Sequence, residues 1–373
     1  MLYYFMFFIT TILVGFGEFS LRRVNKTLGI TMFIVSVLII SVFAGMRDFS
    51  VGVDILVYGN RQFFTFSNFS NFLNIYRYGG VTTEVGYVFF NWFVSRFTTN
   101  IHMFYFLLSF AFTGITFCGI YKLKRYLSIT FAYFIFLLTT WYLSLNLLRQ
   151  SLAMSIVFYS ISCFINKEVK KSLFICGIAV LFHYSSLFIL VILLAIIIFD
   201  RVKISHNRKL LLFIIFVIIV LLFADRLLNI LQTFNFDDIN QRYTEYTELQ
   251  HSGGRVVNIV AIVRFFFPTI ICLLTYYTSK SKISKNELYV PILFALLIST
   301  ISTIQGFNYI VFGRLSYYLL FGYFLSVPII LHNERNSLKR YIYISVVSIW
   351  AVIYFYMHVF ISLYGGIYPF VFK

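Results

Sequence analysis

Long apolar stretches recur from one end of the chain to the other, with mostly short polar segments between them. A membrane-spanning helix needs about 20 apolar residues, and inside lipid a helix satisfies its own backbone amides. The residues do not alternate between polar and apolar, as the strands of a transmembrane barrel do. The pattern predicts an all-α polytopic integral membrane protein with about 11–13 membrane segments.

The composition supports the same class of protein. The 373 residues are 60% hydrophobic and 12% charged, whereas a soluble domain carries about 25% charged residues. The mean hydropathy is +0.88. There is no internal repeat, soluble domain or low-complexity linker, so we expect a single transmembrane domain over residues 1–373. The cysteines lie in apolar segments without metal-site spacing, and we expect buried thiols at Cys118, Cys163, Cys176 and Cys272.

The net charge is +17, and most of the lysines and arginines form short clusters between apolar stretches. The six clusters are Arg22, Arg23 and Lys26; Lys122, Lys124 and Arg125; Lys167, Lys170 and Lys171; Arg201, Lys203, Arg208 and Lys209; Lys280, Lys282 and Lys285; and Arg335, Lys339 and Arg340. The positive-inside rule predicts that all six are cytoplasmic and that the N-terminus lies outside. The charge therefore sets orientation, and we expect no nucleic-acid partner.

Two apolar stretches do not fit as single crossings under this topology. Ser172–Phe199 lies between two cytoplasmic clusters, so it must cross an even number of times or not at all. The polar residues His183–Ser186 near its middle could turn the chain, which predicts a hairpin of two short helices; the alternative is one long kinked helix. Val85–Phe97 is too short to span, so we expect a segment that re-enters from outside.

The outer side then receives two loops, residues 47–84 and 226–258, and cations that are almost all arginine. These are Arg47, Arg61, Arg77, Arg96, Arg149, Arg226, Arg242, Arg255, Arg264 and Arg314, with Lys373 as the exception. The planar guanidinium binds phosphate or carboxylate through two parallel hydrogen bonds, which a lysine cannot do. An arginine-rich outer face therefore favours recognition of an anion.

The first candidate site follows the second helix, in AGMRDFSVGVDILVY. We expect Arg47 to bind an anion and Asp54 to accept a proton or a sugar hydroxyl, with glycines that allow close approach of a ligand. Asp48 and Tyr58 of this segment are candidate substrate contacts. The alternative is that Arg47 and Asp48 form a local pair that ends the helix.

Other polar residues lie where apolar helices meet the outer face. Glu84 in TTEVGY is a candidate for catalysis or substrate binding, or a helix cap. In LNLLRQSLAMS, Arg149 has no acid nearby in sequence, which favours an anionic ligand, and Asn146 and Gln150 are its neighbours. His183 and Tyr184 in FHYSS are candidate site residues, although a lone histidine is often structural.

Two further arginines, Arg264 in AIVRFFFP and Arg314 in VFGRLSYY, lie within apolar segments near the outer face. They could bind the same anion or extend toward lipid headgroups. The sequence contains no HExxH, CxxC, GxSxG or Walker motif, so we expect no metal centre and no cofactor.

Taken in order, GMRDFSVGVD with Tyr58, TEVGY, NLLRQSLA, LFHYSS and a late arginine followed by tyrosines resemble the EpsG family. This family belongs to the Wzy-like membrane polymerases of bacterial exopolysaccharide, capsule and O-antigen synthesis. The resemblance covers about residues 40–330. It implies a GT-C-like helical fold, a multi-pass protein of the bacterial cytoplasmic membrane, and a site that faces the periplasm or cell exterior.

The resemblance also implies a substrate, an undecaprenyl-diphosphate-linked glycan, and no nucleotide sugar. Arg47, Arg149, Arg264 and Arg314 would then hold the diphosphate, and the base would be His183, Asp54 or Glu84. Partners would be membrane lipids and a chain-length regulator and flippase of the same pathway. A lipid-linked glycan ligase and a lipid-linked oligosaccharide flippase or exporter remain the alternative functions.

Overall fold

The computed structural model describes residues 1–79, 83–201 and 317–373, together with a few isolated positions between residues 208 and 297. In these ranges the secondary structure is helical, apart from one isolated bridge between Arg47 and Phe372. The predicted outer loop 226–258 lies outside the described residues, as do Cys272, Arg264 and Arg314.

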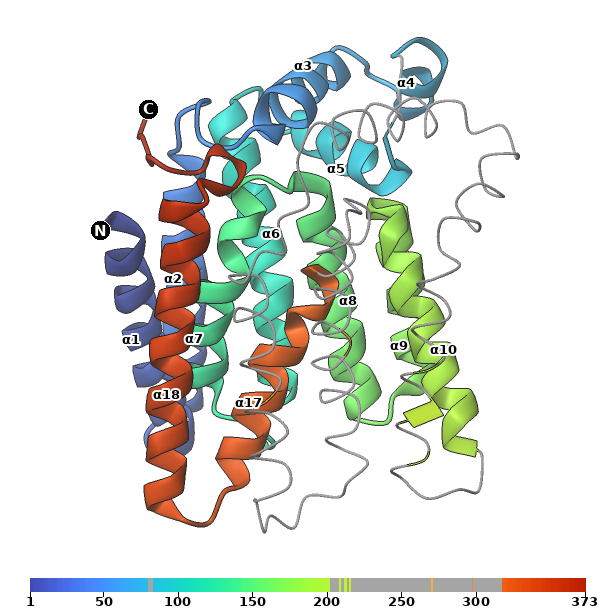
Figure 1. Ribbon diagram of the computed structural model, residues 1–373. Coiled ribbons are helices and arrows are strands. Elements are labelled where there is room, and N and C mark those ends of the chain that lie inside the picture. The colour runs from blue at the N-terminus through green and yellow to red at the C-terminus, as the bar shows by residue number, and fades with distance from the viewer. Residues whose placement is uncertain are drawn as a thin grey trace, which may run out of the picture.

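Five described helices are long and apolar enough to cross a membrane. They are α1 (Leu2–Arg23), α2 (Lys26–Gly45), α6 (Ile101–Lys122), α8 (Leu148–Ile165) and α18 (Ser337–Tyr356), which continues through the π-helical turn η4 (Met357–Ile361). They form a bundle in which α1 and α2 lie at one side (Figure 1). The polytopic all-α class predicted from the sequence is therefore confirmed.

Shorter apolar helices complete the described bundle. They are α7 (Ile129–Thr139), α9 (Val169–Phe182), α10 (Leu187–Arg201) and α17 (Phe321–Asn333). Helix α8 occupies the centre, and almost all of its residues are buried, including Arg149 and Gln150 in its first turn. Polar side chains in the first turn of a buried helix need partners within the protein. The site described below is built around these partners.

The predicted hairpin of two short helices is confirmed by α9 and α10. Helix α9 ends where the backbone of His183 becomes extended, and the 3-10 turn η3 (Tyr184–Ser186) leads into α10. The turn is fixed because the Ser186 amide and hydroxyl both donate to the His183 carbonyl, at 3.0 and 2.8 Å. The polar residues in the middle of the apolar stretch are thus the residues that turn the chain.

The described basic clusters lie at one end of the bundle, drawn at the bottom of Figure 1. There Lys122 of the second cluster bonds Glu168 of the α8–α9 connection at 2.7 Å. His332, before the α17–α18 turn, lies within electrostatic range of Arg22 and Arg340. We call this the basic end. Cys118, in α6, is an exception to the expected burial: its thiol is exposed, whereas Cys163 and Cys176 are buried.

The opposite end carries the short elements, drawn at the top of Figure 1. They are the π-helix η1 (Ile55–Asn60) and the helices α3 (Arg61–Ser67), α4 (Phe72–Tyr78) and α5 (Val85–Ser95), with the 3-10 helix η2 (Trp141–Leu145) preceding α8. Helix α5 has 11 residues, which is too few to span a bilayer. We call this the polar end, because it contains Glu84, Arg149 and His183.

The C-terminal segment closes the polar end over the first candidate motif. After the 3-10 turn η5 (Tyr364–Gly366), the chain runs beside the residues that follow α2. The amide of Asp48 donates to the Val371 carbonyl at 2.8 Å, and the amide of Lys373 donates to the Met46 carbonyl at 3.1 Å. We call residues 364–373 the C-terminal strap.

Candidate active site

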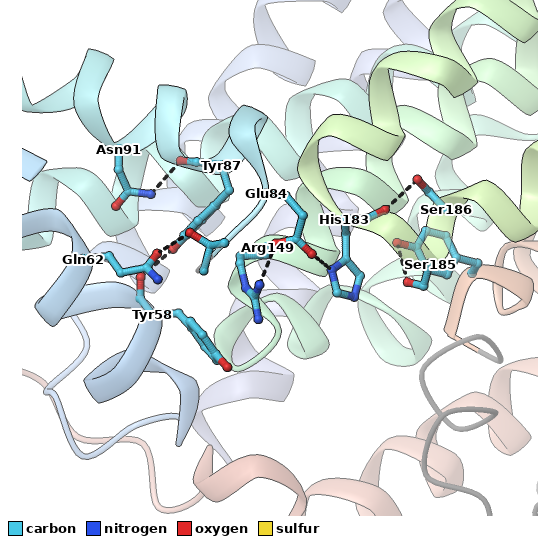
Figure 2. A network of polar contacts seen from close by, with 11 residues as sticks. Tyr58, Gln62, Glu84, Tyr87, Asn91, Arg149, His183, Ser185 and Ser186 are labelled. Atoms are coloured by element: carbon cyan, nitrogen blue, oxygen red, sulfur yellow. Dashed lines mark hydrogen bonds and ion pairs between the residues drawn. The ribbon is translucent and has the colours of Figure 1, made fainter. Parts of the chain in front are cut away.

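Glu84 joins two other candidate residues at the polar end. Its Oε2 accepts a hydrogen bond from Nη1 of Arg149 at 2.6 Å, and its Oε1 lies 2.7 Å from Nδ1 of His183. Figure 2 shows Arg149 and His183 on either side of the carboxylate. The three residues come from three elements: the N-cap of α5, the first turn of α8 and the C-cap of α9.

The three side chains are withdrawn from solvent. Glu84 is 4% exposed and Arg149 is 7% exposed, and the side chain of His183 is 12% exposed. Buried charges are costly unless they are paired and hydrogen-bonded. The Glu84 carboxylate meets this requirement, because one of its oxygens pairs with the Arg149 guanidinium and the other contacts the His183 imidazole.

The protonation state of Glu84 follows from these contacts, since it lies outside the spanning helices. Burial opposes its ionisation, but the hydrogen bond with His183 and the charge of Arg149 outweigh burial and lower the pKa of Glu84 to about 2. A carboxylate this acidic is ionised at neutral pH and is a weak proton acceptor. The geometry therefore favours Glu84 as the residue that orients His183 rather than as the base.

Arg149 has a protein partner that its sequence neighbourhood did not reveal. Arg149 has no acid nearby in sequence, as predicted, but Glu84, which is 65 residues away along the chain, is its tertiary partner. Its guanidinium also lies over the ring of Tyr58, 3.9 Å from the centroid, and Tyr87 donates to the Tyr58 carbonyl at 3.0 Å. Tyr58, expected to contact substrate, thus contacts Arg149 in this arrangement.

Arg47 is enclosed, in contrast to the expected role in binding a diphosphate. It is 1% exposed, its Nη1 donates to the Leu145 carbonyl at 3.0 Å, and its guanidinium lies 4.5 Å from the centroid of the Tyr105 ring. Burial lowers the pKa of Arg47 to about 10, which still leaves it charged at neutral pH. In this structure Arg47 holds the chain before α8 in place.

The alternative reading of Arg47 and Asp48 as a local pair is not what the structure shows. The Asp48 carboxylate accepts hydrogen bonds from the amide and hydroxyl of Ser50, both at 2.9 Å. These contacts lower the pKa of Asp48, with a further contribution from the charge of Lys373. Asp48 therefore stabilises the turn after α2.

Asp54 and Asn146 lie together although they are far apart in sequence. The amide of Asp54 donates to Oδ1 of Asn146 at 3.0 Å. Gly52 has φ +106, and a Cβ there would lie 2.4 Å from the Leu145 carbonyl oxygen. The sequence predicted that a glycine here allows the close approach of a ligand. In the structure, the group that lies close to Gly52 is the backbone carbonyl of Leu145. Asp54 remains half-buried at the edge of the polar end.

Two other predicted substrate contacts, Gln150 and Tyr184, differ in their exposure. Gln150, next to Arg149, is buried at 3% exposure, whereas Tyr184 is 56% exposed beside His183. Ser185 donates to the hydroxyl of Tyr318 at 3.3 Å, so the hairpin turn is tied to the segment that precedes α17. The tyrosines that follow the late arginine motif therefore adjoin the site.

One cluster was missed from the sequence. His358, in η4, is 5% exposed, and its Nδ1 lies 2.7 Å from the hydroxyl of Tyr142, while its ring stacks on Tyr364 with centroids 4.4 Å apart. The available signal was a histidine in an apolar stretch near the end of the chain, without a motif around it.

The chemistry available at the polar end is proton transfer and anion binding. Because Nδ1 of His183 is engaged by Glu84, proton exchange with a substrate would run through Nε2. Arg149 supplies positive charge beside that ring. Within the described residues, no three His, Cys, Asp or Glu side chains are grouped so that they could hold a metal ion.

One comparison with known proteins identifies a family for this chain. The family model described as the EpsG family matches residues 30–372, which is nearly the whole chain. No curated protein and no solved structure gives a significant match. The matched range includes Glu84, Arg149 and His183 and extends into the C-terminal strap. This multi-pass membrane protein therefore belongs to the EpsG family, and its role is of the membrane polysaccharide polymerase kind.

Proposed function

We propose that the protein polymerises undecaprenyl-diphosphate-linked oligosaccharide repeats on the outer side of the bacterial cytoplasmic membrane. The observation that carries the proposal is the Glu84 carboxylate, which bridges Arg149 and His183. Family membership supports polysaccharide polymerisation in general. The positive-inside rule supports an outward polar end, because the described basic clusters lie at the opposite end of the bundle.

The reaction would transfer a glycan from one lipid diphosphate to the sugar of another lipid-linked repeat. The acceptor hydroxyl oxygen attacks the anomeric carbon of the donor, and the bond from that carbon to the diphosphate oxygen breaks. His183 takes the hydroxyl proton, and the leaving undecaprenyl diphosphate carries the electron pair. A diphosphate is already a good leaving group, so cationic stabilisation replaces a strong protein acid.

Each residue of the network then has a distinct role. Glu84 holds the imidazole of His183 through Nδ1, and His183 acts as the general base. Arg149 gives one guanidinium donor to Glu84 and directs further donors to the phosphate oxygens, since arginine has five N–H groups. Arg264 and Arg314 are proposed as additional diphosphate ligands, and Asp54 as a group that positions the acceptor sugar.

The test is reconstitution of the purified protein in liposomes with fluorescent lipid-linked repeats. We expect His183→Ala to reduce chain extension about a hundredfold or more while substrate binding persists. The matched control is His102→Ala, because His102 also lies at the polar end, where its Nδ1 contacts the Gly45 carbonyl and its ring stacks on Phe49. Chain extension by His183→Ala at the unmodified rate would exclude the proposed base.

The same assay separates the alternative functions. A ligase would transfer the glycan to a different acceptor and would not lengthen lipid-linked repeats. A flippase would move the lipid-linked oligosaccharide across the bilayer without a new glycosidic bond. Growth of a ladder of repeats on the lipid carrier is the result that supports polymerisation.

A further inference from the structure

A cavity of about 420 Å³ lies at the basic end, far from the Glu84 network. Its lining consists of Leu21, Arg22, Lys26, Lys124 and Ile129. Three of these five residues are cations, and none is an acid. They come from the end of α1, the start of α2, the segment after α6 and the start of α7.

Two helix N-termini meet the C-terminal turn of α1 at this cavity. Helix α2 begins at Lys26 and α7 begins at Ile129, and both first residues line the cavity. The N-terminus of a helix carries a partial positive charge and unpaired backbone amides. The caps, Asn25 and Ser128, each satisfy one amide, and the Glu18 carboxylate accepts a further amide of α7, that of Thr130. The positive end of α2 is therefore the less compensated of the two.

The nearest acid in this region is already compensated by the protein. Glu18 accepts from Nη2 of Arg22 at 2.7 Å, and its other oxygen accepts from Ser128 Oγ and from the amide and hydroxyl of Thr130, at 2.7–3.1 Å. Among the described residues, no carboxylate pairs with Lys26 or Lys124. Among the described residues, the cavity therefore keeps an excess of two positive charges.

We propose that this cavity binds a phosphate-bearing anion. Its position at the ends of spanning helices, where headgroups lie, favours the headgroup of an anionic phospholipid as the source. The positive-inside rule requires only that cations be present near the helix ends, and it does not require a cavity between four elements. The inference does not rest on the proposed polymerase function.

The test is native mass spectrometry of the purified full chain in an uncharged detergent, with added dioleoyl phosphatidylglycerol or dioleoyl phosphatidylcholine. We expect selective retention of the phosphatidylglycerol. The double variant Lys26→Gln/Lys124→Gln should weaken this retention about thirtyfold, because each basic residue near an anionic headgroup contributes about fivefold. Lys26→Arg/Lys124→Arg, which keeps the charge, should retain it.

The matched control is Lys167→Gln/Lys170→Gln, which removes the same charge from the same end but not from the cavity. We expect it to retain phosphatidylglycerol as the unmodified protein does. Equal loss in both double variants, or equal retention of the two lipids by the unmodified protein, would overturn the proposal. If the cavity variant does not fold, the single variants Lys26→Gln and Lys124→Gln replace it, each with an expected loss of about fivefold.

Competition with inorganic phosphate identifies the source of the anion. If millimolar phosphate displaces the lipid, and raises the thermal stability of the unmodified protein but not of Lys26→Gln/Lys124→Gln, the cavity takes soluble phosphate compounds. If phosphate has neither effect while the lipid is retained selectively, the ligand is a lipid headgroup.

Discussion

The two ends of the bundle use ionisable residues in opposite ways. At the basic end, Lys122 and Lys171 both form ion pairs with Glu168, whose side chain is 38% exposed. At the polar end, Arg149 and Glu84 form a pair whose side chains are 8% and 5% exposed. Surface ion pairs contribute little to stability, whereas removing one partner of a buried ion pair is strongly destabilising. The comparison separates charges that orient the chain from charges that build a site.

The largest expected effect is the loss of the buried acid. Glu84→Ala leaves the guanidinium of Arg149 buried without its counter-ion, which should lower the free energy of unfolding by about 3–5 kcal/mol. Glu168→Ala, the matched change at the basic end, should alter stability little. Thermal unfolding in detergent measures both. An equal shift for the two variants would remove the distinction between the ends.

Next in size is the effect of Arg149→Lys on turnover. Lysine keeps the charge but loses the planar array of donors, so we expect chain extension to fall about a hundredfold. Arg96→Lys is the control, because Arg96 also lies at the polar end and donates to the Ser67 carbonyl. Normal chain extension by Arg149→Lys would show that the planar array of guanidinium donors is not needed to bind the diphosphate.

Gly52→Ala should destabilise the protein by about 1–3 kcal/mol, because Gly52 has a positive φ and its Cβ would collide with the Leu145 carbonyl. Gly177→Ala, in α9, is the control: a Cβ there meets nothing within 4 Å, and alanine favours a helix by up to about 1 kcal/mol. Unfolding temperatures that fall for Gly177→Ala but not for Gly52→Ala would contradict the structure.

The last comparison concerns the dependence of stability on pH. The pKa of Glu84 is lowered from 4.5 to about 2, so its ionised form contributes stability that is complete above about pH 4.5 and is lost as the pH falls toward 2. The difference in unfolding temperature between the unmodified protein and Glu84→Gln should therefore shrink as the pH falls from 5 toward 2. A difference that stayed the same between pH 5 and 2 would contradict a buried, ionised Glu84.

The sequence predicted features that depend on local patterns. Charge parity on the two sides of His183 predicted the α9–α10 hairpin, and the shortness of the stretch after Glu84 predicted that α5 does not span. Glu84, Arg149 and His183 were each singled out, because polar residues next to apolar helices are costly unless they have partners.

The sequence did not predict which residues meet. Arg149 pairs with an acid 65 residues away, and the cover over Arg47 comes from Leu145 and from the strap. Such contacts depend on how helices distant in sequence pack together, and neither hydropathy nor charge clusters carries that information. The sequence therefore predicted the same role, anion binding, for Arg47 and Arg149, although the structure gives them different partners.

The C-terminal strap has a consequence for the order of assembly. The bridge between Arg47 and Phe372 joins residues more than 300 positions apart, and the amides of Gly52 and Val53 donate to the carbonyls of Gly366 and Gly365. Contacts of such high sequence separation form late, after the intervening helices have inserted. A half-inserted chain would leave the segment around Arg47 and Gly52 uncovered. The packing around Arg47 and Gly52 is therefore complete only once the C-terminal strap has docked on this segment.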